Sequence, residues 1–370
     1  MSEQRPVINV TKTYLPPLEE YVRYLEGIWE RGQITNNGPL VQELEARLKE
    51  FLGVKHLFFV SNGTIALQIA IKALCLHGEI ITTPFSYVAT TSSIVWEGCT
   101  PVFVDIDPET LNIDPDLIEA AITPRTTAIL AVHVYGHPCD VERIQAIADR
   151  HGLKVIYDAA HAFGVQYCGQ SLLVNGDVST LSFHATKLFH TVEGGALVTN
   201  DDEVARRIAF MRNFGHRGQE EFWGLGVNGK NSEFHAAMGL CILPMVHALI
   251  ERRKEISRWY DVLLTDCHLF QPTLSDGTDY NYAYYPVLFR SESMLLTTQA
   301  GLNANDIFPR RYFFPSLDSL PYVKQAIVPT ASDISRRMLC MPLSADLNYP
   351  AIERIAALTT WHSSSKVSAV

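Results

Sequence analysis

Seven short apolar segments, each ending in small or polar residues, constrain the fold of this chain more than any other feature. Stretches with the three- and four-residue apolar spacing of helices separate most of them. Strands that alternate with helices indicate an α/β sheet that is mostly parallel and flanked by helices. The predicted strands cover residues 56–60, 79–81, 101–104, 128–134, 154–157, 178–181 and 196–198.

Helical patterns dominate on either side of this central segment. We expect two exposed helices in the first 50 residues, at 18–29 and 41–52, and a long helix at 232–253 that Pro244 interrupts. After about residue 255, helical patterns mix with short strand patterns at 284–289 and 307–313. The sequence therefore predicts two domains and a disordered tail. These are a large α/β domain (1–250), a small C-terminal α+β domain (251–370) and, within the latter, the tail (363–370).

Charge and cysteine content exclude several classes of function. The net charge of −10 argues against nucleic-acid binding, and an anionic substrate would need a local cationic pocket. The seven cysteines are scattered without a CxxC pair, so we expect no disulfide framework and no metal site. There is neither a signal-peptide pattern nor an unbroken apolar run near the ~20 residues of a membrane span. We therefore expect a cytoplasmic protein that does not contact a membrane.

Two ionisable side chains follow predicted strands, at the sheet edge where ligands of such sheets bind. Lys187 lies on the polar turn of LSFHATKLFHTVEGGALVTN, and Asp158 ends KVIYD. Taken alone, Lys187 is either a surface charge or an amine that meets a carbonyl, and Asp158 is either a structural acid or a functional one. Together they suggest pyridoxal phosphate (PLP), whose aldehyde forms a Schiff base with a lysine while an acid keeps its pyridine nitrogen protonated.

Other strand ends add weaker signals. The turn SNGT includes Gly63 and Thr64 before a predicted helix, which suits a phosphate, although helix capping is the commoner role of such residues. Tyr87 could stack on a flat cofactor or simply pack in the core. His161 and His184 lie close to Asp158 and Lys187 in the sequence, but a lone histidine is more often structural than catalytic.

Seven motifs in order carry a more specific signal. They are SNGTIALQIA, PFSYVATTSSI, PVFVDIDPETLNIDP, DAAHAFG, SFHATK, EGGALVTND and GVNGKNSEFHAAMG. This ordered set resembles the DegT/StrS-type sugar aminotransferases, PLP-dependent transferases of fold type I, over about residues 8 to 350. The resemblance implies that Lys187 holds the cofactor aldehyde, that Asp158 holds the pyridine nitrogen and that Tyr87 stacks on the ring. His161 replaces a residue that is often glutamine and contacts the phenolic oxygen.

The resemblance also implies how the phosphate is held. The implied phosphate ligands are Gly63, Thr64 and Ser182. Asn228, in GVNGK, matches an asparagine that the family uses to reach the phosphate of the neighbouring subunit. A homodimer with shared active sites is therefore expected.

Two departures from the family pattern stand out. Val192 replaces the first glycine of GEGG, which the turn should tolerate if its φ is negative. RRYFFPSL replaces a histidine-rich stretch near the substrate, and its Arg310 and Arg311 could bind a nucleotide diphosphate or form an exposed basic pair. Tyr312 of this stretch and His184 complete the expected substrate-binding set.

The expected reaction is transamination of a nucleotide-linked keto sugar, with L-glutamate leaving as 2-oxoglutarate. Lys187 would transfer the proton, which requires a pKa well below the ~10.4 of a free lysine. The opening INVTKTYLPPLEEYVRYLEGIW, the ITNNGP loop and the RRYFFPSL run most resemble the subgroup that forms dTDP-4-amino-4,6-dideoxyglucose from dTDP-4-keto-6-deoxyglucose, for O-antigen or other surface glycans.

Three alternatives to this reaction stay open to different degrees. Amination at C3 of a dTDP-3-keto-6-deoxyhexose is the main alternative. Sugar dehydratases of the same family are less favoured, because one branch has histidine in place of the lysine and another needs an iron–sulfur cluster. A non-enzymatic regulator is argued against by the intact set of lysine, acid and phosphate-binding residues.

Overall fold

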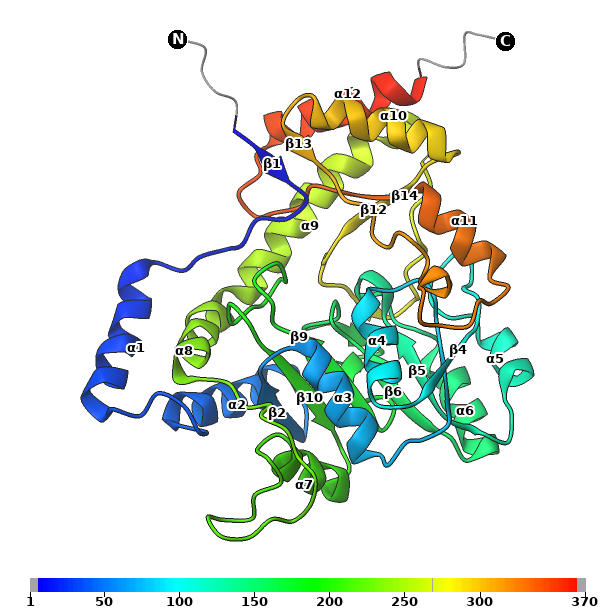
Figure 1. The fold of residues 1–370 in the computed structure, drawn as a ribbon. Coiled ribbons are helices and arrows are strands. Elements are labelled where there is room, and N and C mark those ends of the chain that lie inside the picture. The colour runs from blue at the N-terminus through cyan, green and yellow to red at the C-terminus, as the bar shows by residue number, and fades with distance from the viewer. Residues whose placement is uncertain (1–5, 268, 365–370) are drawn as a thin grey trace.

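A seven-stranded sheet forms the centre of the protein, which is described here from a computed structural model covering residues 6–267 and 269–364 (Figure 1). Strand β10 is antiparallel to both of its neighbours, and the other pairs are parallel. All seven predicted strands are confirmed, with ends that differ by up to two residues. The strand order is β2 (His56–Val60), β10 (Gly195–Thr199), β9 (Val178–Ser182), β6 (Lys154–Asp158), β5 (Thr126–Val132), β3 (Glu79–Thr82) and β4 (Thr100–Phe103).

Helices cover both faces of this sheet, because neighbouring strand residues point to opposite sides. Ala131 and Tyr157 belong to the core on one face, whereas Leu130 and Ile156 belong to the core on the other. The first core includes residues of α2 (Pro39–Leu52), α5 (Pro115–Ala121), α6 (Val141–His151) and α8 (Glu233–Ile242). The second includes residues of α3 (Gly63–Ala73), α4 (Val88–Trp96) and α7 (Asp202–Met211).

The two N-terminal helices differ in burial. In α1 (Leu18–Arg31) only Ile28 is buried, so the expectation of an exposed helix is confirmed there. The expectation of an exposed helix is wrong for α2, because its apolar residues at helical spacing pack into the core and the helix contacts α8. The buried residues of α2 are Leu40, Val41, Leu44, Leu48 and Leu52.

The predicted interruption at Pro244 is confirmed, since a 3₁₀ turn (Leu243–Met245) separates α8 from α9 (Val246–Leu263). The whole stretch Glu233–Leu263 is long and apolar enough to cross a membrane, with a mean hydropathy of 1.5 in its most apolar window. However, 61% of that window is buried inside the protein. The stretch therefore serves as a core helix.

The C-terminal region has its own apolar core around the antiparallel pair β12 (Tyr285–Leu288) and β14 (Met338–Met341). Strand β1 (Ile8–Asn9) pairs with β13 (Ile307–Phe308), so the start of the chain joins this region (Figure 1). The strand expected over 307–313 is thus only two residues long. The helices here are α10 (Glu292–Asn303), α11 (Pro329–Arg337) and α12 (Tyr349–Ser364).

The domain boundary at residue 250 stays a prediction, and α9 crosses it. Helix α12 includes the first two residues of the expected tail, and residues 365–370 lie outside the described residues. A small three-stranded sheet completes the fold. Its strands are β7 (Gln166–Tyr167), β8 (Gln170–Ser171) and β11 (Thr278–Asp279).

A carboxylate links the sheet to the C-terminal region. Asp105 lies just after β4 and is 8% exposed. Its two oxygens accept hydrogen bonds from the backbone N–H groups of Thr330 (2.9 Å) and Ala331 (2.8 Å), in the first turn of α11. The first N–H groups of a helix lack partners within the helix and carry partial positive charge, so a carboxylate stabilises this contact.

Candidate active site

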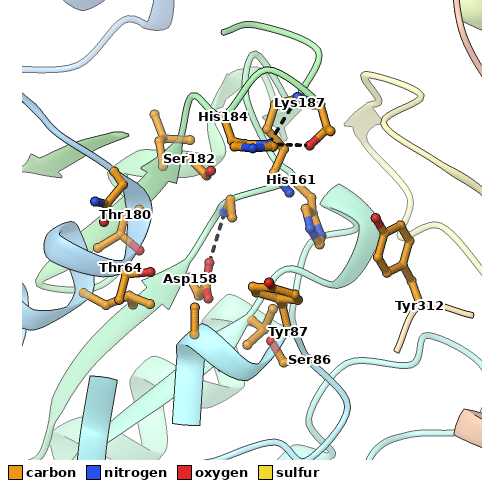
Figure 2. Close-up of a pocket in the computed structure, with 18 of the residues that line it drawn as sticks. Thr64, Ser86, Tyr87, Asp158, His161, Thr180, Ser182, His184, Lys187 and Tyr312 are labelled. Carbon is orange, nitrogen blue, oxygen red and sulfur yellow. Dashed lines mark hydrogen bonds between the residues drawn. The ribbon is translucent and has the colours of Figure 1, made fainter. Parts of the chain in front are cut away.

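A cavity of about 360 Å³ lies beyond the carboxyl ends of β6 and β9 (Figure 2). Residues of the C-terminal region close one side of it. The structure places most of the predicted site residues on its lining, but Asn228 and Arg311 are not among them. The predicted residues that line it are Gly63, Thr64, Tyr87, Asp158, His161, Ser182, His184, Lys187, Arg310 and Tyr312.

The amine of Lys187 points into this cavity from the turn after β9. Its Nζ lies 3.4 Å from the hydroxyl of Tyr284 and 5.8 Å from the centroid of that ring. Burial lowers the pKa of Lys187 to about 8, while the nearby Asp158 opposes this effect. A lysine with such a pKa is partly neutral near pH 8, and only the neutral amine can act as a nucleophile or base.

Asp158 ends β6 and is 7% exposed. It accepts hydrogen bonds from the Thr90 hydroxyl (2.8 Å) and the Ala160 N–H (3.1 Å). Burial raises the pKa of Asp158 above its ordinary value, and these bonds together with the charge of Lys187 offset only part of that rise. In the described part of the chain Asp158 forms no ion pair, so this buried carboxylate keeps acceptor capacity for a donor such as a pyridinium N–H.

Burial lowers the pKa of His161 well below the ordinary value for histidine, and the charge of Lys187 adds to this effect. The imidazole stacks on Phe313, with ring centroids 5.7 Å apart, and meets the edge of Tyr284 at 4.9 Å. Its Nδ1 is buried and has no hydrogen-bond partner among the described residues. Tyr87, in contrast, is 59% exposed at the start of α4, so the alternative that it packs in the core is excluded.

The SNGT turn leaves its glycine and threonine free for a ligand. Asn62 caps α3, since its side chain accepts a hydrogen bond from the Ile65 N–H at 2.8 Å. A Cβ at Gly195 would come within 2.5 Å of the Asn62 carbonyl carbon, so only glycine allows β10 to pass this turn. A Cβ at Gly63 would likewise lie 3.1 Å from that of Ser182. The end of β9 and the N-terminus of α3 therefore meet in a cradle that suits a phosphate.

The two adjacent arginines have different surroundings. Arg311 forms an ion pair with Glu292 (2.8 Å), donates to the Arg336 carbonyl (2.8 Å) and lies over the ring of Phe314. Arg310 lines the cavity and lies 5.5 Å from the centroid of Tyr312. Within the described ranges its guanidinium has no ion pair, so Arg310 is the member of the pair that can contact an anionic ligand.

The other predicted residues lie at the edge of the cavity or away from it. His184 is half-exposed, and its Nε2 lies 3.6 Å from a carboxylate oxygen of Glu193. Asn228 lies on the segment between α7 and α8, where its side chain accepts a hydrogen bond from Lys230 at 2.6 Å. It does not line the cavity of its own chain.

Sequence reasoning missed several residues of the site. Ser86, Thr90 and Tyr284 are the most informative of these. Ser86 and Thr90 have the four-residue spacing of one helix turn and follow a predicted strand, which is a usable signal. Tyr284 comes from a distant part of the chain, and nothing near it in the sequence marks it.

The condition under which the turn should tolerate Val192, a negative φ, is not met. The φ of Val192 is +68°, in the left-handed region that is unfavourable for β-branched residues. Its side chain is 44% exposed, so the strain comes from the backbone rather than from a clash in the core. The valine thus occupies a conformation that glycine adopts at lower energy.

Comparison with known proteins agrees with this geometry. The model of the DegT/DnrJ/EryC1/StrS aminotransferase family matches residues 18–359. The chain belongs to this family. The dTDP-4-amino-4,6-dideoxy-D-glucose transaminase of Shigella dysenteriae is 45% identical over 96% of this chain and 98% of its own. That of Escherichia coli is 42% identical over 95% of this chain and 97% of its own.

Solved structures of this aminotransferase family share the fold. DesI in the presence of its TDP-sugar product matches with a TM-score of 0.92 at 33% identity, covering 97% of this chain and 94% of DesI. Helicobacter pylori PseC, an aminotransferase of pseudaminic acid biosynthesis, matches with a TM-score of 0.89 at 28% identity, covering 97% of this chain and all of PseC. The predicted fold class and the predicted aminotransferase activity are confirmed.

Proposed function

We propose that this enzyme uses PLP to transfer the amino group of L-glutamate to C4 of dTDP-4-keto-6-deoxyglucose. The product would be dTDP-4-amino-4,6-dideoxyglucose, formed in the cytoplasm for O-antigen or other surface glycans. The observation that carries the proposal is the cavity shared by the amine of Lys187 and the carboxylate of Asp158. The names of the two bacterial relatives support the choice of sugar.

The side chains of the cavity fit this cofactor. When bound, PLP supplies an electron sink for the negative charge that develops on the substrate carbon. Asp158 would accept a hydrogen bond from the ring nitrogen, and Tyr87 offers an exposed aromatic face for stacking. The cradle of Gly63, Thr64 and Ser182 would hold the phosphate.

Lys187 would hold the cofactor aldehyde at rest and carry a proton to and from the substrate carbon during turnover. The lowered pKa of its amine makes the neutral form available near pH 8. Tyr284 lies close enough to hold the amine when it is free.

Arg310 is the proposed contact for the diphosphate of the nucleotide sugar, with Tyr312 and His184 beside it. Arg310→Ala should raise KM for the sugar by about 10-fold or more, because charge-assisted hydrogen bonds are among the strong ones. Arg311→Ala is the matched control, since that side chain is already paired with Glu292. An equal rise in KM for both variants would contradict the assignment.

The test of the reaction is a panel of nucleotide keto sugars incubated with the purified enzyme, PLP and glutamate. Mass spectrometry and NMR of the products would identify the aminated carbon. We expect amination at C4 of the dTDP-4-keto sugar. Amination at C3 of a dTDP-3-keto-6-deoxyhexose would favour the alternative reaction, and no amination of any sugar would refute the proposal.

We also propose a homodimer in which Asn228 reaches the phosphate of the neighbouring subunit. Large apolar side chains are exposed near it, including Phe222 (67%) and Leu225 (74%), which is typical of surfaces that become buried on association. Mixing inactive Asn228→Ala and Lys187→Ala chains should partly restore activity. No restoration despite demonstrated exchange of subunits would contradict shared sites.

A further inference from the structure

We propose that Ser86 and Thr90 form a hydrogen-bond relay that positions Asp158 toward the ring nitrogen of the cofactor. This inference rests on the proposed use of PLP. The Ser86 and Thr90 hydroxyl oxygens are 2.7 Å apart, and the Thr90 oxygen lies 2.8 Å from Oδ2 of Asp158. All three side chains are buried, with exposures of 3% for Ser86, 0% for Thr90 and 7% for Asp158.

The direction of the relay follows from the chemistry of its groups. An ionised carboxylate only accepts hydrogen bonds, so the Thr90 hydroxyl must donate its single proton to Asp158. The Thr90 oxygen can then only accept from Ser86, which therefore donates. Thr90 lies in the first turn of α4 and Ser86 lies two residues before that helix begins, so the two hydroxyls meet at the N-terminal end of α4.

The relay and the Ala160 N–H hold the two carboxylate oxygens separately. Ala160 donates to Oδ1 at 3.1 Å while Thr90 donates to Oδ2, so the carboxylate cannot rotate without losing a bond. Its orientation toward the cavity is therefore fixed before any ligand arrives. Loss of the Thr90 bond would free one oxygen and remove one of the interactions that favour the ionised form.

The neighbouring threonine provides an internal contrast. Thr91 is also 0% exposed, yet its hydroxyl has no hydrogen-bond partner among the described residues. Burial alone therefore does not require a partner at this point of α4. The bond of Thr90 depends on its position opposite Asp158, and Thr91 offers a matched control for removal of a buried hydroxyl.

The experiment measures the PLP dissociation constant and, by 15N NMR of the bound cofactor, the pH at which its ring nitrogen loses its proton in the full-length enzyme. Thr90→Val should raise the dissociation constant by about 10- to 100-fold, as expected for loss of a hydrogen bond to a charged group. The ring nitrogen should also lose its proton at lower pH, because the carboxylate holds that proton less well. The charge of Lys187 also lowers the pKa of Asp158, and this lysine is unchanged in every variant.

Three further variants separate positioning from structure. Thr90→Ser keeps the hydroxyl and should restore binding to within about threefold of the wild type, and Thr91→Val should bind PLP as the wild type does. Ser86→Ala should weaken binding by less than Thr90→Val, and it tests the relay even if Thr90→Val fails to fold.

Wild-type binding and an unchanged pH profile in Thr90→Val, or in Ser86→Ala if only that variant folds, would overturn the relay. An equal loss of binding in Thr91→Val would also overturn it, by assigning the effect to packing. Failure of the wild type to bind PLP would instead refute the proposed function, so the two failures are distinguishable.

Discussion

A valine holds a left-handed backbone conformation at the turn before β10, and this is the clearest case of local strain at the residue scale. Val192 has a φ of +68° and lies two residues before Gly194, where a Cβ would clash with Thr191. Only glycine fits at position 194 without a clash, and glycine would also be less strained than valine at position 192.

Val192→Gly should raise the free energy of unfolding by about 0.5–1 kcal/mol. Relief of about 1–2 kcal/mol of left-handed strain outweighs the entropy that glycine adds to the unfolded chain. Chemical denaturation of both proteins would measure the difference. Val192→Ala is a useful comparison, because alanine lacks the branched Cβ but keeps the unfavourable φ. A less stable glycine variant would contradict the account.

The buried amine of Lys187 also affects stability at the residue scale. The pKa of Lys187 is about 8 in the folded chain, compared with the ordinary value of 10.5 that applies in the unfolded chain. Below pH 8 the lysine is charged in both states, and its burial is fully destabilising. As pH rises from 8 to 10.5 the unfolded chain binds more protons than the folded one, so this contribution to stability increases.

Lys187→Met should therefore stabilise the cofactor-free protein at pH 7, and its advantage should shrink between pH 8 and 10.5. Denaturant unfolding at several pH values would measure both effects. Lys324→Met, at an exposed lysine, is the control and should show no such trend. A constant difference between the Lys187 variant and the wild type across this range would argue against the lowered pKa.

At the scale of elements, a buried glutamate from α8 completes the N-terminus of α2. Helix α2 has no side-chain cap of its own, because Gly38 precedes it. Glu233, fully buried, accepts hydrogen bonds from the N–H groups of Leu40 and Val41, both at 3.0 Å. A Cβ at Gly38 would lie 2.6 Å from the Glu233 carboxylate carbon, so the glycine makes room for this contact.

Glu233→Ala should lower the free energy of unfolding by about 2–3 kcal/mol, because two helix N–H groups lose a charged acceptor. Glu233→Gln, which keeps an acceptor oxygen, should cost less. Thermal or chemical unfolding measures these losses. The control is Glu251→Ala, at an exposed acid of α9 that should change stability by less than about 0.5 kcal/mol. Equal losses for all three variants would refute a specific capping role.

These elements show what the sequence could and could not predict. The strands and the break at Pro244 follow from local apolar spacing and proline chemistry, and the strand ends correctly located Lys187 and Asp158. Local patterns carry no information on Glu233, which acts almost 200 residues from the helix that it caps. The same reason explains why Tyr284 was missed and why the pairing of Arg311 with Glu292 was not foreseen.

At the scale of the whole molecule, the cavity joins two regions of the chain. Asp158 and Lys187 come from the central sheet, whereas Tyr284, Arg310 and Tyr312 come from the C-terminal region. Asp105 follows the edge strand β4 and accepts hydrogen bonds from the first turn of α11. These bonds also hold the two regions together. The two regions that line the cavity are therefore also linked by a contact outside it.

Asp105→Asn should lower the free energy of unfolding by about 1–2 kcal/mol, because it weakens charge-assisted bonds to two helix N–H groups. Hydrogen exchange should quicken most in the first turn of α11, where those N–H groups lie. Asp116→Asn, at an exposed acid paired with Arg143, is the control. Exchange that quickens uniformly across the protein would contradict a local link.

The division of the cavity between two regions has a thermodynamic consequence. A ligand that binds only the folded state adds its binding free energy to the stability of every segment that it contacts. PLP would contact the sheet side through Asp158 and Lys187, whereas a nucleotide sugar would also engage Arg310 and Tyr312. The cofactor should thus protect mainly the sheet from unfolding, and the sugar should make the two regions unfold as one cooperative unit.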